Sequence, residues 1–235
     1  KTLRADDLWL RIKAAEALAS IGSKAMPVLP DLLMMVSNFD VKSDPRRMQQ
    51  RYLCFALFNQ RDGMLGRSLD GVDHSLLFAA VKAGLRNEDG RARGSIGSVY
   101  RNLSYEGVEP LLPAIYQAVV EPAPSGIMFA DGIRTAGLKL FAHHHVSEGI
   151  ELLVDYARNQ KKHGSQKRIV RIMDMLEGYG AHAIRVVPTL EEVANYFEKK
   201  ETGFPRRMSR DKARIVRETI KKIRTSIEKP RLTHL

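Results

Sequence analysis

The sequence contains one cysteine, Cys54, and no run of about eighteen apolar residues. A single thiol cannot form an internal disulfide, so cysteine usage leaves the cellular localisation undetermined. The missing apolar run excludes a transmembrane helix, and we expect no membrane insertion. Cys54 lies in the apolar stretch 52–58 (YLCFALF), which predicts a small buried side chain rather than a reactive thiol.

Motifs for catalysis are missing as well. No HExxH, GxSxG or paired-cysteine pattern occurs. The glycines of 90–97 (GRARGSIG) follow no expected strand and have neither phosphate-loop nor dinucleotide-loop spacing, so they indicate close helix packing. The neighbouring Asp73, His74 and Ser75 have the residue types of a catalytic triad, but a triad is a spatial arrangement and adjacency in the sequence argues little.

Three consecutive histidines, 143–145, are the remaining candidate for a metal site. Consecutive side chains on a helix point about 100° apart, whereas zinc ligands must converge on one point. A residue such as Asp131 or Glu148 would have to complete the site. We therefore interpret the run as a partly exposed helix end, and we predict a chain that is not an enzyme and holds no cofactor and no metal.

The composition is that of an ordinary globular chain of 235 residues, with 44% hydrophobic and 28% charged residues. Its net charge of +11 is unevenly distributed. Basic and acidic residues balance over 1–157, whereas 158–235 hold 20 Lys and Arg against 9 Asp and Glu. The basicity therefore belongs to the last third, and it suits phosphate backbones or an acidic protein surface.

The clearest pattern lies in residues 7–37, where two apolar periodic segments flank a glycine. Apolar residues recur three or four positions apart in the first segment and predict an amphipathic helix; they are Leu8, Ile12, Ala15, Leu18 and Ile21. Gly22 is a helix-ending residue, and Ser23 is a candidate N-cap for the second helix. Pro30 should bend or delay that helix. A hairpin this short cannot bury its apolar face alone, so it needs neighbours of the same kind.

This segment resembles a HEAT-type repeat of the bacterial kind. The resemblance rests on Arg11-Ile12-x-Ala14-Ala15-x-Ala17-Leu18-x-x-Ile21-Gly22, followed by Ala25 and Leu29-Pro30-x-Leu32-Leu33. It implies an all-α fold, a right-handed α-solenoid of about five to six HEAT-like hairpins, which usually serves binding. We expect one such domain over 1–235. Because an array normally has a polar capping repeat at each end and this one opens on a full repeat, we also expect a piece of a longer protein.

Looser periodic segments follow the first hairpin, and no strand is expected. They predict helices over 46–59, 74–85, 91–103, 106–120, 127–144, 147–160, 166–179, 181–199 and 209–228. In the first of these, Phe55 is expected to be buried along with Leu53 and Leu57. Pro113 and Pro188 repeat the signature around Pro30 at intervals near two periods of about forty residues, which favours the HEAT and armadillo class.

Two long loops, 60–73 and 121–132, are candidate binding elements. Long insertions in repeat proteins map to one face, often the binding face, so we expect these loops to protrude on related edges. The alternative is that they are solvated connectors with one or two apolar anchors. The candidate residues are Arg61, Asp62, Arg67, Asp70, Met128, Phe129 and Asp131.

The terminal helix, 209–228, combines an apolar stripe with a basic stripe beside it. The apolar stripe comprises Ala213, Val216, Ile220, Ile223 and Ile227. The basic candidates for binding a polyanion or an acidic partner are Lys167, Arg168, Arg171, Arg206, Arg207, Arg210, Arg214, Arg217, Lys221 and Arg224. The alternative is a merely solvated face, since Glu218 and Glu228 offer local pairs and no aromatic residues are interleaved for base stacking.

DNA glycosylases that act on alkylated bases are also built from HEAT-like repeats, and the chain resembles them in fold class only. Their concave face uses tryptophans and an acidic residue near the damaged base, whereas this chain has a single tryptophan, Trp9, in its first repeat. The sequence therefore predicts a non-enzymatic scaffold that binds a protein partner or flanking domains of its own chain. Nucleic-acid or polyanion binding through the basic C-terminal third is the alternative.

Overall fold

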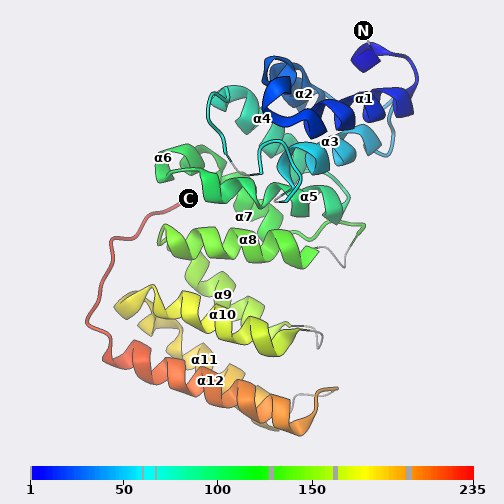
Figure 1. Cartoon of the computed structure of the whole chain (residues 1–235). Helices are drawn as coiled ribbons and strands as arrows, with labels where there is room; N and C mark the ends of the chain where they lie inside the picture. Colours follow the sequence, from blue (N-terminus) through cyan, green and yellow to red (C-terminus); the bar gives the residue numbers. More distant parts are fainter. Residues whose placement is uncertain (1, 60, 67, 127–129, 161–163, 200–202) are drawn as a thin grey trace. The chain divides into compact units, whose positions relative to one another are not determined.

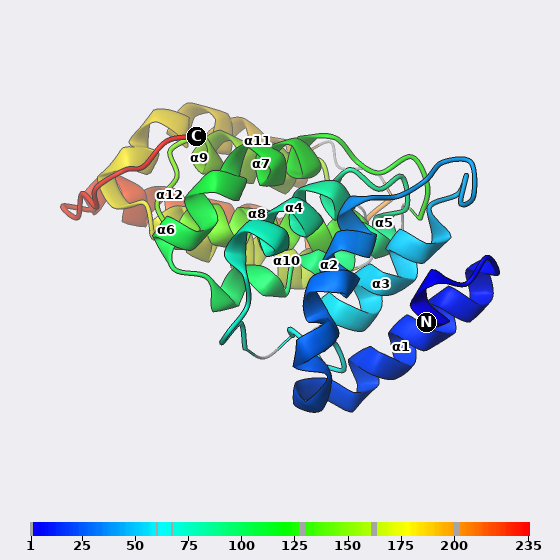
Figure 2. The same ribbon diagram turned by 90° about the horizontal axis from the view of Figure 1, so that it is seen from above.

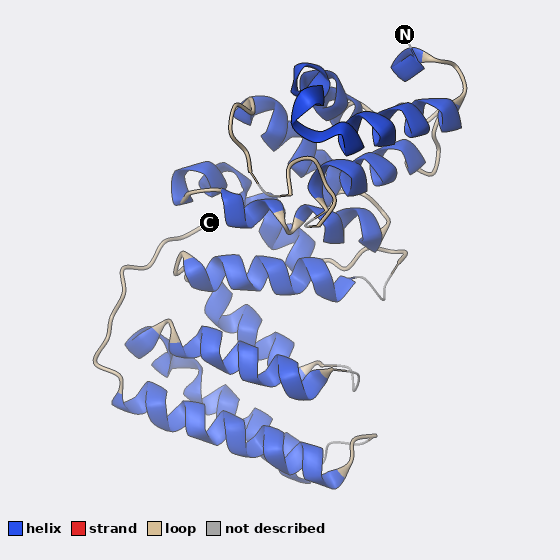
Figure 3. Cartoon of the chain, viewed as in Figure 1, coloured by secondary structure: helices blue, strands red, loops and turns tan. Residues whose placement is uncertain are grey.

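Helices account for all the regular structure in the computed structural model, which describes residues 2–59, 61–66, 68–126, 130–160, 164–199 and 203–235. The expected all-α class is confirmed, and the described residues contain no strand (Figure 3). The chain divides into two compact units, 1–137 and 138–235, and helix α8 (Ala130–His143) crosses the division. Every helix in the described ranges is too short or too polar to cross a lipid bilayer.

Unit 1 (1–137) arranges its helices in two rows. In the first row α1 packs beside α3 and α3 beside α5; in the second row α2 packs beside α4 and α4 beside α7 (Figures 1 and 2). The elements are η1 (Thr2–Arg4), α1 (Leu8–Ile21), η2 (Gly22–Val28), α2 (Leu29–Ser37), α3 (Met48–Phe58), α4 (His74–Leu85), α5 (Gly90–Ile96), η3 (Val99–Asn102), α6 (Tyr105–Val108), η4 (Glu109–Leu111) and α7 (Leu112–Val120).

Among its described residues, unit 2 (138–235) contains the end of α8, four further α-helices and the 3-10 helix η6. Helix α12 packs against both α10 and α11, while α9 contacts α10 and α11 (Figure 1). The elements are α9 (Gly149–Arg158), α10 (Ser165–Glu177), η6 (Gly180–Val186), α11 (Val187–Lys199) and α12 (Arg206–Thr225). The expected terminal helix thus begins three residues earlier, after Pro205, and ends three residues earlier than the apolar stripe predicted.

The three leucine–proline or valine–proline signatures adopt one local structure. Pro30, Pro113 and Pro188 are each the second residue of an α-helix that directly follows a 3-10 helix. Proline is tolerated there because the first-turn N–H groups have no intrahelical partner. The expected delay of the second helix at Pro30 is confirmed. Ser23 is not its N-cap, because the intervening residues form η2.

Two apolar side chains are exposed although their spacing in the sequence predicted that they are buried. Phe55 is 52% exposed, although its neighbours Leu53 and Leu57 are buried. Ile227 is 95% exposed because it lies beyond the end of α12. The helix expected over 91–103 ends at Ile96 and resumes as η3. The expected burial of Cys54 is confirmed, and burial raises the pKa of its thiol to about 12.

The C-terminal strap, residues 226–235, leaves α12 and returns over the turns of unit 2 (Figure 1). Near its start, the N–H of Ala181 donates to the carbonyl oxygen of Glu228 over 2.8 Å. Near its end, Thr233 donates from its N–H to His145 O over 3.0 Å and from its hydroxyl to His144 O over 2.9 Å. The backbone of the histidine run is therefore the anchor of the strap.

Candidate functional site

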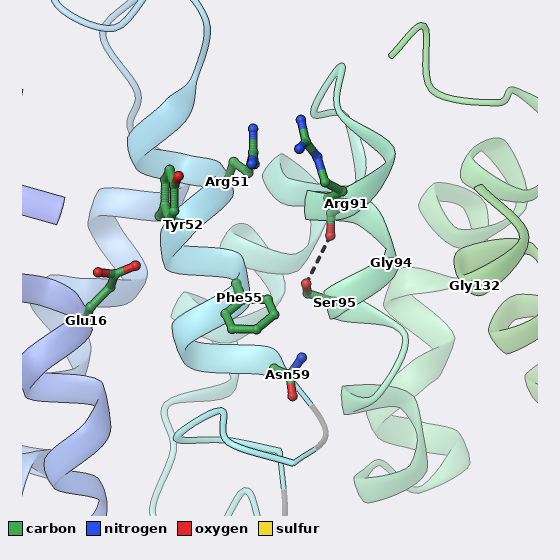
Figure 4. A pocket seen from close by; sticks show the side chains of 9 residues that line it. All are labelled: Glu16, Arg51, Tyr52, Phe55, Asn59, Arg91, Gly94, Ser95 and Gly132. Carbon is green, nitrogen blue, oxygen red and sulfur yellow. Dashed lines mark hydrogen bonds between the residues drawn. The ribbon is translucent and has the colours of Figure 1, made fainter. Parts of the chain in front are cut away.

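A largely apolar groove lies across the first row of helices of unit 1. It encloses about 690 Å³ and collects side chains from α1, α3 and α5 together with the first turns of α8 (Figure 4). The lining residues are Glu16, Arg51, Tyr52, Phe55, Asn59, Arg91, Gly94, Ser95 and Gly132. This volume lies within the range of about 300–1,000 Å³ that is typical of ligand-binding clefts.

Small residues bring α5 and α8 together beneath this groove. A Cβ atom added at Gly97 would lie 2.6 Å from the Cβ of Ala136, so these helices touch there. A Cβ added at Gly132 would lie 3.9 Å from the Cα of Gly94, which places two residues without side chains opposite each other. The glycines of 90–97 therefore serve helix packing, as expected, and two bare backbone surfaces leave room for the groove.

Aromatic side chains form the wall of the groove on α3. The half-exposed ring of Phe55 lies between α3 and α5, and the ring of Tyr52 lies one turn earlier (Figure 4). Trp9 of α1 meets the Tyr52 ring edge to face with centroids 5.8 Å apart, and 51% of its own surface remains exposed. Burying a large apolar side chain is favourable by roughly 1.5–3 kcal/mol, so exposed rings that line a hollow are candidate contacts for a partner.

Two arginines at one end of the groove share one carboxylate. Asp89 Oδ2 accepts from Arg91 over 2.6 Å and pairs with the guanidinium of Arg51 at 3.2 Å. Asp89 Oδ1 also caps α5 by accepting from the Arg91 N–H over 2.8 Å. The side-chain hydrogen bonds from Arg91 are the main cause that lowers the pKa of Asp89. The backbone N–H of Arg91 and the charge of Arg51 lower this pKa further, whereas burial acts to raise it.

Three other polar side chains that line the groove, those of Glu16, Ser95 and Asn59, already have partners. The carboxylate of Glu16 pairs with Lys13 at 2.8 Å. The hydroxyl of Ser95 donates to the carbonyl oxygen of Arg91 over 3.0 Å (Figure 4). Asn59 Oδ1 accepts from the N–H of Arg61 over 2.9 Å. The arginine pair is therefore the main source of uncompensated charge in the groove.

The two candidate loops lie at opposite ends of the first-row helices rather than on related edges. Loop 60–73 folds back on the end of α3, where the N–H of Leu65 donates to Leu57 O over 2.7 Å and Leu65 is itself buried. Loop 121–132 instead meets the start of α5, where the N–H of Gly90 donates to Ser125 O over 2.9 Å. The first loop therefore packs against the unit instead of protruding from it.

The candidate residues of these loops do not form a common cluster in the described ranges. Arg61, Asp62 and Asp70 are exposed, and Asp131 lies in the first turn of α8. Arg67, Met128 and Phe129 lie outside the described residues.

Several members of the basic stripe form ion pairs. Arg214 pairs with Glu218 at 2.8 Å on the same helix. Arg217 and Arg224 reach across to α11, where they pair with Glu198 at 2.8 Å and Glu191 at 2.6 Å. All five candidates over 210–224 are exposed, so each of these pairs contributes little to stability.

Other basic candidates keep their charge unpaired. These side chains are exposed and form no ion pair with any residue in the described ranges; they are Lys167, Arg171, Arg206, Arg207, Arg210 and Lys221. Ser165 contacts Met208 at 3.9 Å and Glu177 accepts from Thr219 over 2.8 Å, so α10 and α12 run parallel with an offset of about 42–43 residues. This register places Lys167 level with Arg210.

The remaining sequence candidates have structural roles. The Asp73 carboxylate accepts from the N–H and hydroxyl of Ser75 over 2.8 and 2.7 Å, which makes it the N-cap of α4. His143 and His144 stack edge to face at the end of α8. Arg168 of α10 is half-buried, whereas Lys167 and Arg171 on the same helix are exposed. In the part of the chain that the structure describes, no group of three His, Cys, Asp or Glu side chains is placed to hold a metal ion.

The groove residues were missed by sequence reasoning, although one signal was available. Tyr52, Phe55 and Asn59 are spaced three and four residues apart, so they share a face of α3. Leu53 and Leu57 lie on another face, which is the buried one. The expectation that Phe55 is buried with Leu53 and Leu57 was wrong, because Phe55 lies on the face of α3 that lines the groove. Comparisons of the chain with family models, with curated proteins and with solved structures found no match.

Proposed function

We propose that the chain is a HEAT-type α-solenoid, a non-enzymatic scaffold, and that unit 1 binds a segment of a partner protein in the groove of α1, α3 and α5. The proposal of a repeat array is supported by hydrogen bonds that recur at separations of 37–43 residues within each unit; the donor and acceptor pairs are Arg11 and Gln49, Asn87 and Gln50, Ser125 and Glu88, Arg185 and Ser147, and Ser165 and Met208. Regular spacing is expected where each repeat contacts its neighbour.

The exposed aromatic wall is the observation that carries the binding proposal. Phe55 is about half exposed and lines the groove together with Tyr52, and Trp9, which is also about half exposed, contacts the Tyr52 ring beside the groove. Aromatic residues and arginine dominate the energetics of protein interfaces, and this groove combines both with a hollow that admits a side chain. The partner is a separate protein or a flanking part of the same polypeptide.

Selection of peptides on the purified chain tests this function. We expect a library of random twelve-residue peptides to yield binders that lose at least about tenfold in affinity on Phe55→Ser, since the ring is a central anchor. Val41→Ser is the matched control, because Val41 is 56% exposed but does not line the groove. Failure to enrich any peptide, or equal losses in the two variants, would contradict the proposal.

The exposed cations of α10 and α12 that form no ion pair within the described ranges favour polyanion binding by unit 2 as a second candidate function. Binding to single-stranded DNA or heparin should weaken steeply with salt, by a slope of roughly 0.7–0.9 per phosphate contacted. The double variant R207Q/R210Q should reduce this slope by about 1.5, because both arginines are exposed and form no ion pair with a residue that the structure describes. R217Q/R224Q removes the same charge from ion-paired positions and should reduce it less. Salt-independent binding, or a slope that R207Q/R210Q leaves unchanged, would exclude this function.

A further inference from the structure

We propose that the segment bound in the groove carries an acidic residue beside an aromatic or large aliphatic residue. The carboxylate would contact Arg51 and Arg91, and the apolar side chain would pack on Phe55 and Tyr52. This inference rests on the proposed function of unit 1 and specifies the chemistry of its partner.

The cluster of Arg51, Arg91 and Asp89 attracts an anion because of its net charge. Two guanidinium groups meet one carboxylate, Asp89, so the cluster keeps one net positive charge. Asp89 is largely buried whereas the Arg91 side chain is 44% exposed, which leaves the cationic part of the cluster facing the groove and the solvent. A guanidinium has five N–H donors, and the bonds to Asp89 use only some of those on each arginine.

The two guanidinium groups are already ordered before a ligand binds. Asp89 is held as the N-cap of α5 and grips Arg91 through both Nε and Nη2, at 2.9 and 2.6 Å. The guanidinium of Arg51 lies 5.2 Å from the Tyr52 ring centroid. Both side chains point the same way at one end of the groove (Figure 4). A ligand carboxylate therefore meets donors that are already ordered, which reduces the entropy lost on binding.

An apolar surface lies next to the arginine pair in the groove. Phe55 lies farther along the groove than the arginines, between α3 and α5 (Figure 4). Gly94 and Gly132 line the same groove and have no side chains, so backbone forms this part of its wall. A ligand with an anionic group next to an apolar group would therefore contact the arginines and Phe55 together.

A basic segment is the competing occupant, and the structure disfavours it. Glu16 is the acidic residue among those that line the groove, and its charge is answered by Lys13 at 2.8 Å. Asp89 is likewise engaged by two arginines. A lysine or arginine of a partner would therefore find no uncompensated carboxylate among the lining residues.

The composition of the selected peptides tests the inference separately from the function. We expect peptides enriched on the purified chain to share Asp or Glu within about three residues of an aromatic or large aliphatic residue. Replacing that acid by its amide should weaken binding about five- to tenfold, and raising the salt should weaken it as well. Arg91→Gln should cause a similar loss for the acidic peptide but almost none for its amide version. Arg46→Gln is the control, because it removes the same charge from an exposed residue that does not line the groove, and it should leave the affinity unchanged.

The outcomes separate the two proposals. Enriched peptides that depend on Phe55 but carry no acid, or carry a base instead, would overturn the inference and leave protein binding standing. Acidic peptides that bind Arg91→Gln as tightly as the native chain would also overturn it. If no peptide is enriched, both proposals fail. Circular dichroism of Arg91→Gln confirms that the variant folds, and the amide peptide serves as the test that needs no variant.

Discussion

Replacing Gly180 by alanine is expected to lower the free energy of unfolding by about 2–4 kcal/mol and to detach the C-terminal strap. Gly180 has φ +57°, a conformation that costs an L-residue roughly 1–2 kcal/mol. An added Cβ would also overlap the carbonyl oxygen of Glu228, the atom that accepts from Ala181 N–H. The backbone of the strap must therefore move, and that hydrogen bond must lengthen or break.

Gly164→Ala is the matched control for this substitution. Gly164 lies in the same unit with φ +72°, but the nearest atom to its added Cβ is 3.9 Å away, so only the conformational cost applies. Hydrogen exchange should show faster exchange at Ala181, Ser147 and Thr233 in Gly180→Ala alone, because their N–H groups bond across the strap contacts. Unchanged protection at these three amides, or an equal loss of stability in the control, would contradict the role assigned to the overlap.

The strap could not be predicted from the sequence because its contacts are non-local. The Thr233 hydroxyl bonds to the carbonyl oxygen of His144, a residue 89 positions away, and no local pattern relates the two segments. The histidine run offered signals for a metal or a helix end only, whereas its role here depends on backbone carbonyl groups that any residue has. Local capping was easier to predict. The helix expected over 74–85 has those bounds, because Asp73 provides the cap and its apolar residues a regular spacing.

The candidate sites follow the same division between local and non-local information. The basic stripe was visible as a helical pattern, but its partial neutralisation depends on Glu191 and Glu198 of α11, which lie 33 and 19 residues from their partners. The arginine pair of the groove depends on α3 and α5 lying side by side. Arg51 and Arg91 are forty positions apart in the sequence and meet through Asp89. Only the register between the helices reveals that they share a ligand-facing end.

Asp89→Asn is expected to destabilise the chain by about 1–2 kcal/mol at pH 7, a figure reduced because part of the cluster reaches the solvent. Asparagine retains an oxygen that can cap α5, so the loss isolates the charge. Without the carboxylate, the guanidinium groups of Arg51 and Arg91 repel each other and the amide N–H₂ faces one of them. Urea unfolding at pH 7 measures the difference between the native chain and the variant.

The pH dependence of that difference separates the charge from other effects of the substitution. The folded state lowers the pKa of Asp89, so its contribution is fully present above the ordinary carboxyl pKa and is lost as the pH falls through the lowered value. The destabilisation by Asp89→Asn should therefore be constant from pH 7 to pH 5 and shrink below about pH 4, where the native side chain becomes protonated and resembles asparagine. Asp73→Asn is a comparison for the loss of a capping carboxylate at pH 7, because Asp73 also caps a helix but its carboxylate pairs with Ser75 and not with an arginine. A destabilisation by Asp89→Asn that persists undiminished at pH 2 would show that the two arginines are held in place by packing rather than by the shared carboxylate.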